Sequence, residues 1–77
     1  IFSKQGFRFF YFANEGKEPP HIHVQYQSSA AKFWLCPVIL DKNLGMTAAE
    51  LRKAAALVIR HEKLFKEKWD AFFSHIK

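Results

Sequence analysis

The sequence has 77 residues, a formal net charge of +5 and 17% aromatic residues, among them nine phenylalanines and two tryptophans. That length predicts a single domain over residues 1–77, and the hydrophobic fraction of 49% excludes a disordered tail. The single cysteine, Cys36, excludes an internal disulfide framework and a multi-cysteine zinc finger.

The first half of the chain has the pattern of β-strands. Aromatic residues dominate residues 7–13, where we predict a first strand. Residues 20–27 alternate polar and apolar side chains, which is typical of a strand with one covered face. A third strand is predicted at residues 30–36, ended or bent by Pro37, with Ser28 and Ser29 as the two-residue turn before it.

This turn fixes which side chains face each other across the second hairpin. His23 is predicted to face Trp34, and His21 to face Cys36. The hydrophobic pattern of the first strand assigns its aromatic residues to the two faces of the sheet. Phe10 and Phe12 are expected on the apolar face, and Tyr11, Phe7 and Phe9 on the face that carries the histidines.

The second half is predicted to be helical over residues 47–75. Thr47 and Glu50 fit a capping box, and no Gly or Pro interrupts the apolar stripe that follows. A continuous helix would be roughly 40 Å long, about twice the length of the strands. Either the helix breaks near residues 60–62, or its distal end packs on a second subunit. The predicted fold class is α+β, a three-stranded antiparallel sheet with one long or two consecutive C-terminal helices on one face.

His21 and His23 are the strongest candidates for chemistry. Their spacing on a strand places both imidazoles on one face, roughly 6–7 Å apart. In an alternative interpretation, Cys36 joins them as the third ligand of a metal site, and this ligand set favours zinc. With a carboxylate from Glu18 or Glu15 as a ligand, the site could also hold another divalent transition metal. No metal or other cofactor is favoured.

The metal-free alternative is acid–base cleavage of RNA by the two imidazoles, with Lys32 as the third catalytic residue. Either Lys32 or Arg8 would stabilise the phosphorane. Four further residues are predicted to bind the RNA, by charge, hydrogen bonding or base stacking: Arg8, Tyr11, Gln25 and Trp34. A structural alternative stays open, in which the imidazoles bond to loop carbonyls and hold the turn at Pro19 and Pro20.

Several segments resemble a bacterial family of small proteins, the domain-of-unknown-function family numbered 4160. The resemblance is carried by residues 6–10, 14–16, 18–24, 31–35, 49–51 and 68–69, with Pro-Pro-His-Ile-His-Val at its centre. The most recognisable residues of the family, placed on this sequence, are Pro19, Pro20, His21, His23, Phe33, Trp34 and Trp69. Cys36 is outside the family pattern. The resemblance implies a neighbouring small partner protein and a suspected toxin–antitoxin module.

Two functions therefore remain open. The first is a toxin-like protein that acts on RNA as a metal-independent ribonuclease. The second is a binding module without chemistry, whose aromatic–histidine face binds a cognate small protein or forms a homodimer. The charge of +5 favours anionic partners in both cases.

No apolar run reaches the roughly 20 residues of a membrane helix. We therefore expect no membrane contact and a cytoplasmic location. The sequence begins with Ile1 instead of Met, so native residues are expected upstream of it.

Overall fold

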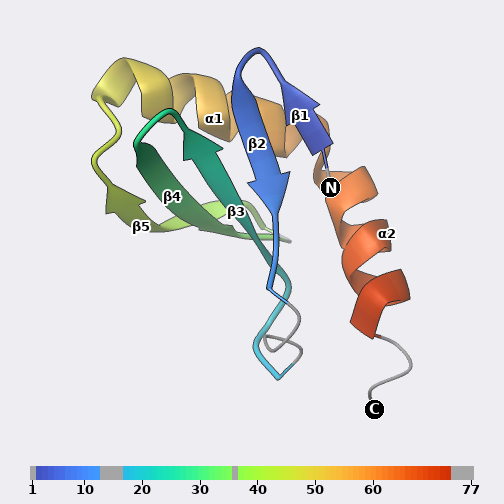
Figure 1. Ribbon diagram of the computed structural model, residues 1–77. Coiled ribbons are helices and arrows are strands. Elements are labelled where there is room, and N and C mark those ends of the chain that lie inside the picture. The colour runs from blue at the N-terminus through green and yellow to red at the C-terminus, as the bar shows by residue number, and fades with distance from the viewer. Residues whose placement is uncertain (1, 13–16, 36, 74–77) are drawn as a thin grey trace.

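Five strands and two helices follow one another along the chain in a computed structural model that describes residues 2–12, 17–35 and 37–73 (Figure 1). The strands are β1 (Phe2–Lys4), β2 (Phe7–Phe10), β3 (His21–Tyr26), β4 (Ser29–Trp34) and β5 (Ile39–Leu44). The helices are α1 (Ala48–Arg60) and α2 (Glu62–Phe73). Each strand pairs antiparallel with the next, so the sheet order is β1-β2-β3-β4-β5. The predicted α+β class is confirmed, but the sheet has five strands, and the prediction of three was wrong.

The two unpredicted strands form the edges of the sheet. β1 pairs with β2 through a tight turn at Gln5 and Gly6, whose φ angles are 55° and 85°. Positive φ at both turn residues gives the twist that a two-residue hairpin needs. β5 follows Pro37, and all its residues are exposed. Because it buries no apolar face, β5 has none of the alternation by which a strand is recognised in sequence.

The register between β3 and β4 differs from the predicted one by two residues. Tyr26 pairs with Ser29, so the turn is Gln27 and Ser28, with Gln27 at a φ of 53°. As a result His23 faces Lys32. Because side chains on a strand alternate with a period of two, this shift leaves every side chain on its predicted face. The hydrophobic pattern cannot distinguish registers that differ by an even number of residues.

The faces of the first hairpin were predicted wrongly, because its register is one residue away from the expected one. Phe9 pairs with Val24, and Phe7 and Phe9 are 1% and 0% exposed beneath the helices. Phe10 pairs with His23 on the opposite face. Phenylalanines occupy both faces of β2, so their hydrophobicity carries no alternation, and exposed Arg8 is the residue that marks the outer face.

α1 covers one face of the sheet, and α2 packs beside the β1 edge, with its Phe65 ring on Phe9 and its Trp69 ring on His21. Figure 1 shows α1 crossing behind the strands and α2 turning away from it beside the β1 edge. The predicted capping box starts α1: the Glu50 amide donates to Thr47 Oγ1 at 3.1 Å, and the Thr47 amide donates to Glu50 Oε1 at 3.0 Å. The predicted break is confirmed at His61, and the alternative of one continuous helix was wrong.

The break lets α2 contribute three buried side chains at intervals of four residues, Phe65, Trp69 and Phe73. Phe65 joins a core built from the inner faces of β2, β3 and β4 and from α1, while Trp69 and Phe73 pack on Tyr11. The buried members of this core include Phe7, Phe9, Ile22, Val24, Ala31, Phe33, Leu35, Met46, Ala54, Leu57 and Val58. Neither of the two described helices has the length and apolar character to cross a membrane.

Candidate functional site

The sheet face turned away from α1, called the open face below, carries aromatic and polar side chains in rows across the strands. The register gives three rows: Arg8 and Gln25; Phe10, His23, Lys32 and Lys42; His21, Trp34 and Ile39. Six of the seven predicted catalytic and binding residues therefore share one face. Their side chains differ in exposure, and this difference decides which of them can contact a ligand or a partner.

His21 is completely buried, with 0% exposure. Its ring lies 4.9 Å from the Trp69 ring of α2 and 5.5 Å from the Trp34 ring, measured between centroids. Its Nδ1 lies 3.0 Å from the carbonyl oxygen of Pro19. Because a carbonyl only accepts, Nδ1 carries the proton and donates it. The position of His21 therefore matches the structural alternative, in which an imidazole bonds to a loop carbonyl and holds the turn before β3.

His23 is only partly buried and lies among aromatic rings. The Phe10 ring stacks on it at 5.7 Å with an interplanar angle of 21°, and the Phe12 ring approaches its edge at 4.8 Å. Phe12 is 52% exposed. Half-buried Trp34 lies on the same face, and the buried His21 ring between them contacts both Trp34 and His23. We call this partly exposed set of rings the aromatic strip: Phe10, Phe12, His23 and Trp34.

Lys32 occupies the centre of the open face and already has anionic neighbours. Its Nζ lies 3.0 Å from Glu18 Oε1 and 3.6 Å from Asp41 Oδ2. The same Nζ sits 4.4 Å from the centre of the Trp34 ring, a cation–π contact. Two carboxylates neutralise this ammonium group, so it offers little attraction to a phosphate. Sequence reasoning missed Asp41, since its segment was not recognised as a strand.

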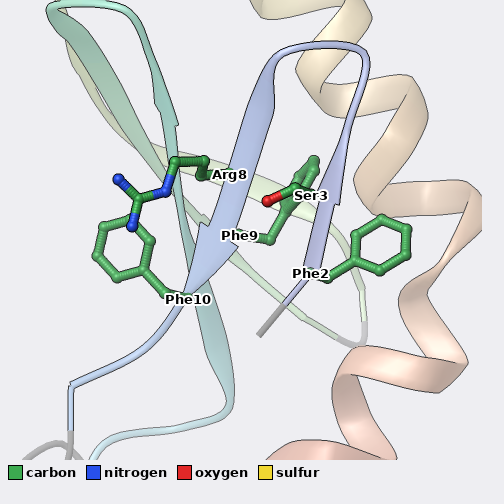
Figure 2. Close-up of a pocket in the computed structure, with 5 residues that line it drawn as sticks. All are labelled: Phe2, Ser3, Arg8, Phe9 and Phe10. Carbon is green, nitrogen blue, oxygen red and sulfur yellow. The ribbon is translucent and has the colours of Figure 1, made fainter.

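A shallow pocket of about 280 Å³ lies at the β1–β2 end of the sheet, lined by Phe2, Ser3, Arg8, Phe9 and Phe10. Figure 2 shows the Arg8 and Phe10 side chains projecting to the same side of β2, and the Phe2 ring turned towards the helices. The Arg8 guanidinium donates a long hydrogen bond to Gln25 Oε1 at 3.4 Å. Arg8 therefore brings an exposed positive charge to the border of the aromatic strip.

Tyr11 does not lie in the histidine rows, contrary to the prediction. Its ring packs against α2, 5.4 Å from the Trp69 ring and 5.7 Å from the Phe73 ring. Burial in this contact raises the pKa of the Tyr11 phenol above its usual 10.0. The cause is the same one-residue error that exchanged the faces of the first hairpin. Stacking on a base is therefore not available to Tyr11 on the open face.

The alternative metal site of His21, His23 and Cys36 was predicted from a pairing of His21 with Cys36 that the structure does not have. In the observed register His21 faces Trp34, whereas Cys36 was predicted opposite it. Cys36 and Glu15 lie outside the described residues. Over residues 2–12, 17–35 and 37–73, no group of three His, Cys, Asp or Glu side chains is placed to hold a metal ion. Zinc binding by His21, His23 and Cys36 stays a prediction.

Comparisons with known proteins give one match. No curated protein and no solved structure matches the chain. A family model described as a domain of unknown function, DUF4160, matches residues 6–70. This segment contains β2 to β5, α1 and most of α2, together with the whole open face apart from β1. The chain therefore belongs to the DUF4160 family.

Proposed function

We propose that the protein is a non-catalytic interaction module that binds a cognate small protein through the aromatic strip. The observation that carries this proposal is the contrast between the two histidines. His21 is sealed inside and bonded to a backbone carbonyl, while His23 lies in a partly exposed band of rings. Buried His21 supports the sheet from within, and partly exposed His23 is placed to contact a partner.

The composition of the strip supports binding to protein. Aromatic side chains and arginine dominate the energetics of protein interfaces. An aromatic ring gives a large contact area with few rotatable bonds, and the planar arginine guanidinium adds charge and several hydrogen-bond donors. Phe12 and Trp34 supply such area, and Arg8 adds a cation at the border of the strip. An exposed Phe12 at 52% costs hydration free energy unless another molecule covers it.

RNA cleavage has less support from the same residues. General acid–base catalysis needs two groups that reach the substrate, and the His21 ring has no exposed surface. Lys32, proposed to stabilise the phosphorane, lies between Glu18 and Asp41. A ribonuclease would have to open the contact between His21 and Trp69 and also displace a carboxylate from Lys32.

The partner we propose is the small protein encoded beside members of this family, so that the pair forms a toxin–antitoxin-like module. The net charge of +5 favours an acidic partner, and long-range attraction between opposite charges speeds association. Binding should therefore weaken as the salt concentration rises.

The test is a calorimetric titration of the protein with the purified product of the neighbouring gene. Phe12→Ala and Trp34→Ala should each weaken binding at least about tenfold, as expected for residues at the centre of an interface. Ile59→Ala is the matched control, because Ile59 is 60% exposed on α1, on the other side of the sheet. Thermal unfolding of each variant checks that the fold is retained.

Two results would overturn the proposal. In the first, the neighbouring protein binds the wild type, and Phe12→Ala and Trp34→Ala bind it with the same affinity as the wild type. The other is cleavage of total RNA by the metal-free wild type that is lost in a folded His23→Ala variant. The second result would establish the ribonuclease instead.

A further inference from the structure

β5 leaves one long edge of the sheet uncovered. It is the last strand in the sheet order, and among the described residues no strand lies on its outer side. All its residues are exposed, and its two ends carry apolar side chains, Ile39 at 54% and Leu44 at 64%. The backbone donors and acceptors of such an edge can pair with another strand.

A β-bulge changes the alternation of side chains along β5. Lys32 pairs with Lys42, but the next pair is Phe33 with Leu40, so Asp41 is an extra residue. Asp41 Oδ2 lies 3.6 Å from the Lys32 Nζ, which places Asp41 on the open face beside Lys42. Two consecutive charged side chains of opposite sign therefore stand on the same face of this edge.

The remaining residues of β5 follow from their pairing. Leu40 lies across from buried Phe33, on the helix side of the sheet. Asn43 lies on the same side, because it pairs with buried Ala31 and bonds to both backbone groups of Met46. Ile39, paired with Trp34, lies on the open face, and alternation from Asn43 places Leu44 there as well.

We propose that β5 pairs antiparallel with β5 of a second copy of this chain, about a two-fold axis that passes between Asp41 and Lys42. Asp41 then faces Lys42 of the second copy, and the symmetry repeats this ion pair. Ile39 faces Leu44 of the second copy on the open face, and Leu40 faces Asn43 on the helix side. Because of the bulge, all these facing pairs lie on matching sides of the joined sheet.

The charges select this register. A shift of one residue in either direction would place Lys42 opposite its own copy, or Asp41 opposite its own copy. Such a shift would also bring open-face side chains opposite helix-side ones. Bulges and lysines normally protect an edge strand from foreign strands. Here the same features are self-complementary, so they reject other partners and other registers while accepting an identical strand.

The resulting dimer has a definite shape. The two five-stranded halves form one continuous sheet, with both α1 helices on one side and both aromatic strips on the other. This dimer forms through β5 and not through the aromatic strip, so a partner protein meets two strips related by symmetry.

The experiment measures the mass of the protein by sedimentation equilibrium over a range of concentrations, with a reductant present to exclude a disulfide through Cys36. The wild type should be a dimer. Asp41→Lys and Lys42→Asp each place like charges across the axis, so each should weaken self-association at least about tenfold. Lys63→Asp changes the same charge on the exposed side of α2 and should leave the dimer intact.

Rescue gives the decisive result and separates interface loss from misfolding. A mixture of Asp41→Lys with Lys42→Asp restores both ion pairs, so it should form a heterodimer, and the double variant carrying both changes should form a homodimer. A wild type that stays monomeric at all concentrations overturns the proposal. So does a dimer that tolerates both single changes, or a folded mixture that fails to associate. None of these readouts depends on the aromatic strip, so they stand or fall separately from the proposed function.

Discussion

The assignment of His21 as an internal support is open to a direct test of stability. His21→Ala removes a ring with 0% exposure that contacts Trp69, Trp34 and His23, together with the hydrogen bond to the Pro19 carbonyl. Truncating a buried aromatic side chain to alanine costs about 3–5 kcal/mol. The imidazole is smaller than a phenyl ring, so we expect about 3 kcal/mol, of which about 1 kcal/mol belongs to the hydrogen bond.

His23→Ala is the matched comparison two residues away on the same strand. His23 is partly exposed, and its replacement should cost less than about 1 kcal/mol. His21→Phe keeps the buried ring but loses the hydrogen bond, so its cost should be about 1–2 kcal/mol. This third variant matters because a small domain has only about 3–5 kcal/mol to lose, and His21→Ala therefore risks unfolding it.

The assay is urea unfolding followed by tryptophan fluorescence. Both tryptophans of the chain, Trp34 and Trp69, touch His21, so their emission reports on its surroundings. The midpoint should fall in the order wild type, His23→Ala, His21→Phe, His21→Ala. Equal midpoints for His21→Ala and His23→Ala would refute the supporting role and return both imidazoles to the list of candidate functional groups.

Three further changes test the local structure by the same unfolding measurement. Gly6→Ala should lower the free energy of unfolding by about 1–2 kcal/mol, because a φ of 85° strains alanine and the new Cβ would lie 3.1 Å from Cε1 of Tyr26. An unchanged free energy of unfolding would exclude this turn geometry. Thr47→Ala should cost about 1 kcal/mol by removing the acceptor for the Glu50 amide, and Thr47→Ser should restore most of it. The raised pKa of Tyr11 means that above pH 10.0 the folded state keeps a proton that the unfolded chain has lost, so stability falls as the pH rises there. Tyr11→Phe should remove this part of the alkaline loss, and an unchanged pH dependence would contradict the burial of the phenol.

How much of the sheet could be predicted depended on the alternation of each strand. In β3, polar and apolar residues alternate, so the face of His21, His23 and Gln25 was predicted correctly although the turn was misplaced by one residue. In β2, a run of phenylalanines gives no such signal, and its faces were exchanged. The only marker was Arg8, whose charge belongs outside, and reading the strand from that residue would have given the observed faces.

The burial of His21 had no signal in the sequence near it. Alternation places its side chain on the open face, where a polar residue is expected. What seals it is Trp69, which is far along the chain and reaches the start of β3 only because the helix breaks at His61. The direction that α2 takes after the break depends on packing against the sheet. The helical segment contains no Gly or Pro from which this direction could be predicted.

β5 shows why an exposed edge strand escapes sequence reasoning and why it matters for function. A strand that buries nothing shows no alternation, and the extra residue Asp41 disturbs even the period of two. Yet an edge without a covering strand has to be explained, because unpaired strand edges lead to uncontrolled association. A row of lysines would repel a second identical strand. Asp41 and Lys42 instead attract each other across the axis when β5 pairs antiparallel with a second copy of itself, as we propose. In the proposed dimer, the feature that hid the strand from prediction is the one that gives its edge a specific partner.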